Sequence, residues 1–516
     1  MHQSKKYTPT VPQAKPLDHL VLSRKTKDSA LKLRDETLDY GALDCRVGQL
    51  AHWLLEQGFA AGDRVATWLP KTETACIMPL ATARAGLVHV PINPLLKHAQ
   101  VAHILADSGA KCLISNTSRL KSLGGGDVPD SCALHDEKPA MEVWKAVKSP
   151  LGPSDAAPDD LVAILYTSGS TGQPKGVMLS HANLWLGAVS VAGYLNVTAD
   201  DRTLCVMPLS FDYGQNQLLS TWYAGGCCVP LDYLTPRDVI KACAKHEITT
   251  LGAIPPLWVQ LVEQEWPAAA SAPLRRLTNT GGALTERLVR QLRAIFCDAD
   301  IYAMYGLTEA FRSTYLDPAL IDDNPLSIGK AIPFAEIMVV NDAGEKAGPE
   351  EEGELVHAGP LVAQGYWQDS SRTAERFRPA PGFSEFGGMA VWSGDRVRRD
   401  RDGLIYFVGR RDAMIKSSGN RISPAEVENT ALDTGLVAET VALGIAHARL
   451  GHEIVLFVRP QMGQGLDTEQ LRRILKKELP NFMVPHHIIA LESFPKNPNG
   501  KLDRTVLKKI AEEQIA

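Results

Sequence analysis

Residues 166–181 read YTSGSTGQPKGVMLSH, and this stretch decides how the rest of the sequence is interpreted. Glycines and hydroxyl side chains crowd together ahead of Lys175, so the backbone can turn tightly with free N–H groups, beside hydroxyl donors and one positive charge. An apolar segment, LVAILY (161–166), precedes the stretch, and a helical pattern, SHANLWLGAVSVAGYL (180–195), follows it. The stretch therefore predicts a loop that holds a polyphosphate.

The spacing of this loop differs from that of a Walker-type phosphate loop. That motif requires G-x-x-x-x-G-K followed by Ser or Thr, whose hydroxyl binds magnesium. Here Gly169 stands six positions before Lys175, and Gly176 follows the lysine. A kinase-type or GTPase-type site is therefore disfavoured. A flexible Gly/Ser linker is also disfavoured, because apolar segments flank the loop on both sides.

Toward the N-terminus, residues 37–115 alternate between helical and strand patterns. Helical spacing is seen in VGQLAHWLLEQG (47–58), ETACIMPLATARAG (73–86) and QVAHILADSGA (100–110), and short strands are expected in DRVATWLP (63–70), LVHVPIN (87–93) and KCLIS (111–115). Such alternation predicts parallel strands with helices on both faces, a doubly wound α/β sheet. Residues 119–158 are polar and rich in Gly and Pro, which predicts a surface excursion.

Toward the C-terminus the α/β pattern resumes near residue 160 and changes at about residue 326. From there to residue 411, short strands such as GELVHAG (353–359) alternate with turns, which predicts a β-rich subdomain. We therefore expect a large N-terminal domain over 1–411, with the β-rich part at 326–411. Residues 412–516 are expected to form a small C-terminal α+β domain.

The composition excludes several classes of protein. The chain has 516 residues, of which 45% are hydrophobic and 22% charged, as in ordinary globular proteins. A formal net charge of -5 argues against a nucleic-acid partner, and nine cysteines without C-x-x-C spacing favour reduced thiols. The first residues lack an apolar leader, and Leu184–Val197 is too short and too polar for a membrane span. We expect a cytoplasmic protein.

Several further segments occur in one order across nearly the whole chain. They are LDYGALDCRVGQLAHWLLEQG (38–58), ARAGLVHVPINP (83–94), NTGGAL (279–284), MYGLTE (304–309), WSGD (392–395), GRRDAMIKSSGNRISPAEVE (409–428) and NPNGKLDR (497–504). Together with the loop, they make the sequence resemble the adenylate-forming superfamily: acyl-CoA synthetases, peptide-synthetase adenylation domains and firefly luciferase. The resemblance implies that the C-terminal domain is a mobile lid.

The resemblance implies an ATP site. Tyr305 would stack on adenine, Asp395 would bind both ribose hydroxyls, Thr308 would reach the α-phosphate, and Glu309 would hold Mg²⁺. Lys175 would bind the β- and γ-phosphates. The full set of ATP-binding residues implied in this way is Thr167, Ser168, Gly169, Ser170, Thr171, Gly172, Lys175, Gly281, Gly282, Ala283, Tyr305, Gly306, Thr308, Asp395, Arg410 and Arg421.

The chemistry explains why such residues are needed. Attack of a carboxylate on the α-phosphorus of ATP brings negative charges together, so positive groups must offset the repulsion. The catalytic residues implied are Lys501, Glu309, Thr308 and Lys175. The lid would rotate about a hinge at Asp412. One conformation would place Lys501 in the site, and the other would bring Ser418 and Gly419 to a tunnel for the thiol of CoA.

The acid pocket is expected to contain Phe211, Asp212, Asn216, Met304 and Arg312. Phe211-Asp212 resembles the Phe-Asp pair of amino-acid-activating domains, whose aspartate holds the substrate ammonium, although Asp212 could instead cap a helix or lie in a turn. Arg312 could pair with Asp212 or Glu309, or bind an acidic group of the substrate. Two charges suit a short polar acid or an amino acid better than a plain long fatty acid.

These observations predict an AMP-forming acyl-CoA ligase that uses ATP, Mg²⁺ and CoA. The alternative is an amino-acid-activating ligase that loads a separate carrier protein, because no phosphopantetheine attachment segment follows Lys501. A non-enzymatic ATP-binding protein is disfavoured, since Lys501, Glu309 and the loop are all present. A luciferase-like oxidative second step would leave the same motifs and stays open.

Overall fold

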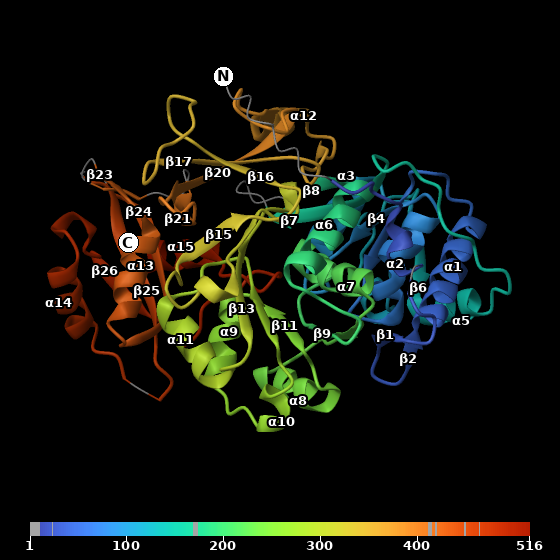
Figure 1. The fold of residues 1–516 in the computed structure, drawn as a ribbon, viewed down its shortest axis with the longest axis horizontal. Helices are drawn as coiled ribbons and strands as arrows, with labels where there is room; N and C mark the ends of the chain where they lie inside the picture. The colour runs from blue at the N-terminus through green and yellow to red at the C-terminus, as the bar shows by residue number, and fades with distance from the viewer. Residues whose placement is uncertain are drawn as a thin grey trace, which may run out of the picture.

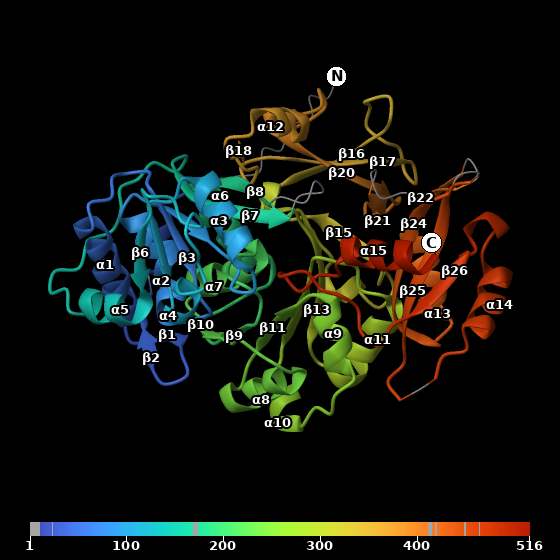
Figure 2. The ribbon, with the colours of Figure 1, turned by 180° about the vertical axis from the view of Figure 1, so that it is seen from behind.

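The computed structural model describes residues 11–22, 24–168, 174–410, 415–417, 420–447, 450–463 and 465–515. Figure 1 shows the N-terminal segments at one end, the middle of the chain in the centre, and the C-terminal domain at the opposite end, and Figure 2 shows the same order from behind. Within the described residues, no helix is both long enough and apolar enough to cross a bilayer.

The first α/β unit is built on a seven-stranded sheet. Its strands lie in the order β18 (Gly365–Tyr366), β8 (Pro174–Ser180), β7 (Leu161–Ser168), β4 (Val88–Pro91), β3 (Arg64–Trp68), β5 (Cys112–Ser115) and β6 (Ala133–Asp136). The pairs from β7 to β6 are parallel, as the alternating pattern predicted. The helices of this unit are α1 (Tyr40–Glu56), α2 (Glu73–Arg84), α3 (His98–Ser108), α4 (Thr117–Leu120), α5 (Glu137–Lys145) and α6 (His181–Tyr194).

Local chemistry fixes the ends of α1. The side chain of Asp39 accepts a hydrogen bond from the backbone N–H of Ala42 at 2.7 Å, which satisfies one of the free donors at the start of the helix. Just beyond the end of the helix, Gly58 has φ +84°, a conformation that residues with a Cβ rarely adopt.

The second α/β unit and the β-rich segment share one larger sheet. Its strands run in the order β16 (Glu336–Val340), β17 (Glu352–Ala358), β20 (Met389–Arg399), β21 (Ile405–Arg410), β15 (Ser327–Ala331), β14 (Thr314–Tyr315), β13 (Asp300–Tyr305), β12 (Arg276–Asn279), β11 (Thr250–Ala253), β9 (Arg202–Cys205), β10 (Cys227–Pro230), β1 (Ser29–Lys32) and β2 (Thr37–Asp39), with β19 (Phe377–Pro379) paired to β20. The strands from β13 to β1 are parallel, whereas the β-rich strands are antiparallel.

Helices that accompany this sheet are α7 (Asp212–Ala224), α8 (Pro236–His246), α9 (Pro255–Val262), α10 (Ala268–Ser271), α11 (Glu286–Ile295) and α12 (Ser370–Arg376). The C-terminal domain has its own sheet of β23 (Asn420–Ile422), β22 (Ile415–Ser417), β25 (Gly451–Pro460), β24 (Val437–His447) and β26 (His487–Ala490), with α13 (Pro424–Asp433), α14 (Thr468–Glu478) and α15 (Arg504–Ile515). The predicted fold class, doubly wound α/β sheets with β-rich strands and a small α+β domain, is confirmed.

One local prediction was incomplete and another was wrong. The strand before the stretch 166–181 and the helix after it are confirmed as β7 and α6, but the sequence did not reveal β8, which pairs antiparallel with β7 so that Thr167 lies opposite Lys175. Residues 119–158 are also more than a surface excursion. They contain β6, which extends the parallel sheet, and α5, whose Trp144 is fully buried. The short length of both elements hid their periodicity.

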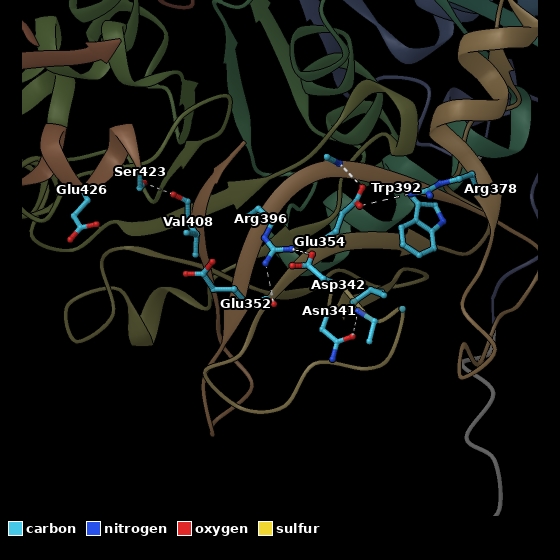
Figure 3. Close-up of a pocket in the computed structure, with 14 residues that line it drawn as sticks. Asn341, Asp342, Glu352, Glu354, Arg378, Trp392, Arg396, Val408, Ser423 and Glu426 are labelled. Atoms are coloured by element: carbon cyan, nitrogen blue, oxygen red, sulfur yellow. Dashed lines mark hydrogen bonds and ion pairs between the residues drawn. The ribbon is translucent and has the colours of Figure 1, made fainter. Parts of the chain in front are cut away.

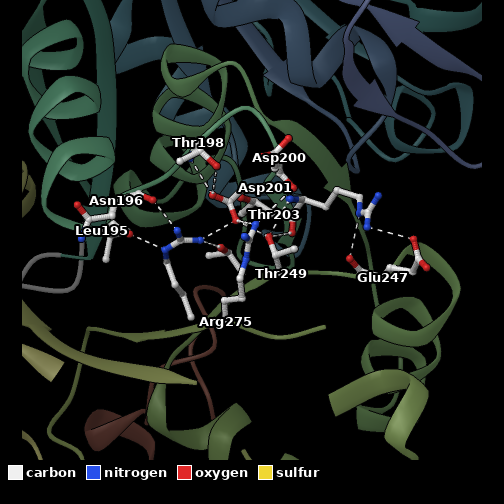
Figure 4. A network of polar contacts seen from close by, with 12 residues as sticks. Leu195, Asn196, Thr198, Asp200, Asp201, Thr203, Glu247, Thr249 and Arg275 are labelled. Atoms are coloured by element: carbon white, nitrogen blue, oxygen red, sulfur yellow. Dashed lines mark hydrogen bonds and ion pairs between the residues drawn. The ribbon is translucent and has the colours of Figure 1, made fainter. Parts of the chain in front are cut away.

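A buried carboxylate ties the start of β9 to its neighbours. Asp201, which is fully buried, accepts hydrogen bonds from Arg275, Arg276 and Thr249 at 2.6–2.7 Å (Figure 4). Its second oxygen accepts the backbone N–H of Thr198 at 2.8 Å. Burial raises the pKa of Asp201, but the hydrogen bonds from Thr249, Thr198 and Arg276 outweigh it, so that the pKa lies below its ordinary value.

We predict that Asp201→Asn destabilises the protein by about 3 kcal/mol or more, because two arginines then lose their buried partner. A carboxylate whose pKa is lower in the folded protein than in the unfolded chain stabilises the fold. This stabilisation is complete above the unfolded pKa of about 3.9, and it is lost as the pH falls through the folded pKa. The difference between wild type and variant, measured by urea unfolding, should therefore shrink below about pH 4. The exposed neighbour Asp200 provides the control: Asp200→Asn should leave stability nearly unchanged. Equal effects of the two substitutions would contradict this account.

Candidate active site

The predicted residues meet in a cavity at the carboxyl ends of β12 and β13. The cavity has a volume of about 270 Å³, and residues 279–284 and 303–307 line one side of it. Residues 325–328 together with Asp395, Phe407, Arg410 and Lys501 line the rest. Gly281, Gly282, Ala283, Tyr305 and Gly306, all predicted from the sequence, are among the lining residues. The carboxyl ends of parallel strands are where α/β sheets bind ligands.

Tyr305 and Asp395 form one wall of this cavity. The hydroxyl of Tyr305 donates a hydrogen bond to Oδ2 of Asp395 at 2.5 Å, and Nη1 of Arg410 lies 3.6 Å from Oδ1 of the same carboxylate. Burial and the adjacent Asp395 both raise the pKa of Tyr305 well above its ordinary value, so the hydroxyl stays protonated and donates. Tyr305 and Asp395 thus present an aromatic ring and a carboxylate to the same cavity.

A chain of three side chains lies beside the end of β13. Nζ of Lys175 donates to the hydroxyl of Tyr366 at 2.6 Å, and that hydroxyl donates to Oε1 of Glu309 at 2.6 Å. Lys175 and Glu309 also form an ion pair at 3.4 Å. Burial raises the pKa of Glu309, but Lys175 and Tyr366 outweigh it and hold the pKa below its ordinary value. Glu309 is therefore an ionised carboxylate in a buried position.

Sequence reasoning missed Tyr366. The residue lies in β18, which pairs with β8 so that Tyr366 faces Val177, and this pairing brings it to Lys175 across almost two hundred residues of chain. Its local sequence, QGYW (364–367), carries neither charge nor periodicity that points to a site. The local sequence therefore contained no physical signal that could have found it.

Lys501 reaches the cavity from the loop that precedes α15. Its Nζ lies 4.5 Å from the centre of the Phe211 ring, and a methyl group added at Gly281 would lie 2.9 Å from its Cε. Burial lowers the pKa of Lys501, and Asp212 partly offsets this effect. Nδ2 of Asn93 donates to the backbone oxygen of Pro498 at 2.8 Å, so the loop is held against the N-terminal domain.

The predicted acid pocket holds two buried charges that do not pair. Asp212 is 3% exposed, its Oδ1 has no hydrogen-bond partner among the described residues, and burial raises its pKa. Arg312 is 1% exposed, and its guanidinium lies 4.9 Å from the centre of the Tyr213 ring. In the described part of the chain, Arg312 forms no ion pair within 4.0 Å with Asp212 or Glu309. Of the sequence-based alternatives, the geometry thus disfavours an Arg312 ion pair.

Other predicted residues are placed less completely. Thr308 lies in the short 3₁₀ turn Thr308–Ala310 beside Glu309, and Thr167 pairs with Lys175 in the hairpin. Gly169, Ser170, Thr171, Gly172, Asp412, Ser418 and Gly419 lie outside the described residues, as do the side chains of Ser168 and Arg421. The phosphate loop, the hinge and the thiol tunnel therefore stay predictions.

A larger cavity of about 640 Å³ contains none of the predicted residues. It lies between the β-rich strands and the start of α13, where Ser423 donates a hydrogen bond to the backbone oxygen of Val408 (Figure 3). Arg396 pairs with Asp342 at 2.7 Å, and the guanidinium of Arg378 lies 3.9 Å from the Trp392 ring. Because both arginines already have partners, we assign no ligand to this cavity.

Comparisons with known proteins agree with the geometry. Two relatives cover the chain almost completely. The L-proline–[L-prolyl-carrier protein] ligase of Pseudomonas fluorescens is 29% identical over 95% of this chain and 98% of its own length. The feruloyl-CoA synthase of an Amycolatopsis species is 29% identical over 92% of this chain and 94% of its own length. The crystal structure of ATP-bound MatB from Rhodopseudomonas palustris has a TM-score of 0.88 at 24% identity, over 98% of this chain and 100% of that chain. This last likeness concerns the fold.

Two family models match the chain. The model described as AMP-binding enzyme matches residues 19–367, and the model described as AMP-binding enzyme C-terminal domain matches residues 426–501. The first match alone spans well over half of the sequence and includes the Lys175 hairpin, Tyr305 and Glu309. The protein belongs to the AMP-binding family, the adenylate-forming enzymes.

Proposed function

We propose that the protein activates a short polar carboxylic acid with ATP, releases pyrophosphate, and transfers the acyl group to the thiol of CoA. The observation that carries this proposal is the position of Lys501. Its amine is enclosed beside Phe211 in a cavity that also presents Tyr305 and Asp395. A positive charge at this point suits a reaction that joins a carboxylate to a phosphate.

In the first step, an oxygen of the acid attacks the α-phosphorus of ATP, and the bond from that phosphorus to the bridging oxygen of pyrophosphate breaks. Lys501 would lie between the carboxylate and the α-phosphate, Thr308 would donate to that phosphate, and Lys175 would bind the leaving pyrophosphate. One such donor in a closed site is typically worth about 3 to 4 kcal/mol in the transition state.

Glu309 fits a magnesium ligand. Its pKa is held low and Tyr366 fixes its orientation, so it offers an ionised oxygen where phosphates would lie. Mg²⁺ is commonly held by one or two carboxylates together with substrate phosphates. When bound there, the ion would neutralise phosphate charge. Asp395 would hold the ribose, and Tyr305 would present its ring to adenine.

In the second step, the thiol attacks the acyl carbonyl, the bond from that carbon to the AMP oxygen breaks, AMP leaves, and the thiol proton passes to solvent. We propose that the lid turns about Asp412 between the steps, so that Lys501 withdraws and the face with Ser418, Gly419 and Arg421 approaches. Free CoA is the first candidate acceptor, and the similarity to feruloyl-CoA synthase supports it.

A second candidate is the loading of an amino acid onto a separate carrier protein. Two observations favour it: the similarity to the proline ligase, and the unpartnered Oδ1 of Asp212 in the acid pocket. A buried carboxylate of this kind could hold a substrate ammonium through a charge-assisted hydrogen bond. The two candidates share the adenylation step and differ in the acid and the acceptor.

Lys501→Ala is expected to lower the rate of acid-dependent pyrophosphate exchange by roughly 10²- to 10³-fold, because the charge that offsets the repulsion is lost. Transfer of a preformed acyl-adenylate to the thiol should continue, since Lys501 serves only the first conformation. Single-turnover assays of each half-reaction test this, and the exposed Lys508 on α15 supplies the control Lys508→Ala. Equal loss of both half-reactions would refute the assignment.

Tyr366→Phe is expected to lower kcat/KM for MgATP by roughly 10- to 100-fold, because a hydrogen bond to charged groups is lost at both Glu309 and Lys175. The melting temperature should change little, since Lys175 and Glu309 can still pair directly. Tyr223→Phe, at a half-buried tyrosine far from the cavity, is the matched control. Unchanged kinetics in Tyr366→Phe would show that the hydroxyl positions neither group.

Asp212→Ala separates the two candidate functions. If Asp212 holds an ammonium, the variant should lose about 10²-fold or more in kcat/KM for an amino acid and keep its activity toward the des-amino analogue, since only the amino acid loses a charge partner. Pyrophosphate exchange with both acids, on wild type and variant, measures this. Equal loss on both substrates would reject the aminoacyl candidate and leave the acyl-CoA proposal.

A further inference from the structure

Arg312 is a buried charge that the described residues compensate only in part. It is 1% exposed, and neither Nε nor Nη2 has a hydrogen-bond partner among the described residues. Its guanidinium contacts the face of Tyr213 at 4.9 Å, an arrangement that leaves the edge of the guanidinium open. Burying the N–H donors of a charged group costs free energy unless an acceptor forms hydrogen bonds with them.

The position of Arg312 is fixed by its neighbour. Phe311 has φ +56°, an unusual conformation for a residue with a Cβ, and its ring is fully buried. The ring packs against Gly187 of α6 so closely that a methyl group added there would lie 2.3 Å from it. Strain of this kind persists only where the surroundings enforce it, and it gathers at functional sites.

The guanidinium lines a small cavity of about 20 Å³, which has room for a group about the size of a water molecule. Several polar groups around it already have partners, such as Tyr213 with Thr278 and Thr221 with Thr203. Among the described residues, Nδ2 of Asn216, Nε and Nη2 of Arg312, and Oε1 of Gln217 have no hydrogen-bond partner. Three of these four lining atoms are hydrogen-bond donors, and the Gln217 oxygen is an acceptor.

This cavity adjoins the site where the reaction would occur. Met304 lines both the small cavity and the larger one that contains Tyr305, Asp395 and Lys501. Its thioether accepts a hydrogen bond from the hydroxyl of Tyr194 at 2.9 Å. Methionine side chains are flexible and adapt to irregular space, so Met304 can move aside for a ligand that enters from the larger cavity.

The charges around the pocket favour an anion. Lys501 would face the reacting carboxylate, and Lys175 is already paired with Glu309. The remaining acid, Asp212, lies in surroundings that disfavour its charged form, since burial raises its pKa. Arg312 is then the cation left over when the reacting end of the acid is in place.

We propose that Arg312, together with Asn216, binds a second anionic group at the far end of the substrate, so that the enzyme activates short dicarboxylic acids. Nε and Nη2 lie on one edge of the guanidinium and match the two oxygens of a carboxylate in a bidentate pair. A carboxylate is larger than this water-sized cavity, so the pairing requires Met304 to move aside. This inference rests on the proposed adenylation of an acid and adds the class of that acid.

The first test uses wild-type enzyme and matched acids of one length. Pyrophosphate exchange is measured with succinate, with its monoamide succinamate, whose amide end is uncharged, and with 4-aminobutyrate. Malonate and glutarate are added to vary the length. At the best length, the dicarboxylate should exceed its monoamide by about 100-fold or more in kcat/KM, as expected for a buried charge pair. Equal values for the two acids, or a preference for 4-aminobutyrate, would overturn the inference and leave the proposed function standing.

The second test uses variants. In Arg312→Met the preference should disappear, so that the ratio of kcat/KM for the dicarboxylate to kcat/KM for the monoamide falls to about 1. Arg312→Lys should keep part of the preference, and Asn216→Ala should weaken it; these two variants serve if Arg312→Met fails to fold. The control is Arg24→Met, because Arg24 also lies over a tyrosine, Tyr223, at 5.1 Å, away from the pocket. A dicarboxylate preference that survives in Arg312→Met would overturn the inference.

A binding measurement separates this inference from the proposed function. If no acid supports exchange, the proposed function fails, and the melting temperature is then measured with each acid in excess. A rise with the dicarboxylate but not the monoamide, seen in wild type and absent in Arg312→Met, would still support the anion site. No difference between the two acids would overturn it.

Discussion

The contact chain from Lys175 through Tyr366 to Glu309 is the interaction on which the arrangement of the site depends. It joins the β7–β8 hairpin, the short strand β18 and the turn after β13, three segments that are far apart in the sequence. A buried carboxylate and a buried ammonium are costly when separated, so each holds the other's segment in place. The Tyr366 hydroxyl accepts a hydrogen bond from Lys175 and donates one to Glu309, which fixes the orientation of both side chains.

The C-terminal domain also carries a buried charge whose cost is offset by contacts elsewhere. Enclosing Lys501 is unfavourable, as its lowered pKa indicates, and the contacts of the same loop with Asn93 offset part of the cost. The C-terminal domain is also held by an ion pair between Arg459 and Glu263 at 2.9 Å. The enclosed position of Lys501 is thus supported by contacts outside the reaction centre.

The buried polar groups around Asp201 have hydrogen-bond partners, whereas several of those around Asp212 and Arg312 have none among the described residues. Around Asp201 both carboxylate oxygens have partners, and the network links β9, β11 and β12 as structural contacts should. Around Asp212 and Arg312, several buried donors and acceptors have no hydrogen-bond partner among the described residues. Because buried polar atoms are normally hydrogen-bonded, this cluster is the basis of the anion site proposed above.

The sequence by itself determined the parallel α/β architecture, the β-rich segment, the small C-terminal domain and half of the residues that line the cavity, including Tyr305, Asp395 and Lys501. The architecture follows from local periodicity, and the cavity residues follow from the resemblance of the motifs to the adenylate-forming superfamily. Only the tertiary structure decided that β8 pairs antiparallel with β7, that Tyr366 bridges Lys175 and Glu309, and that Arg312 has no acidic partner among the described residues. The physical reason is that strand pairing and side-chain partners depend on contacts between distant segments, and no local pattern records which distant group a buried charge will meet.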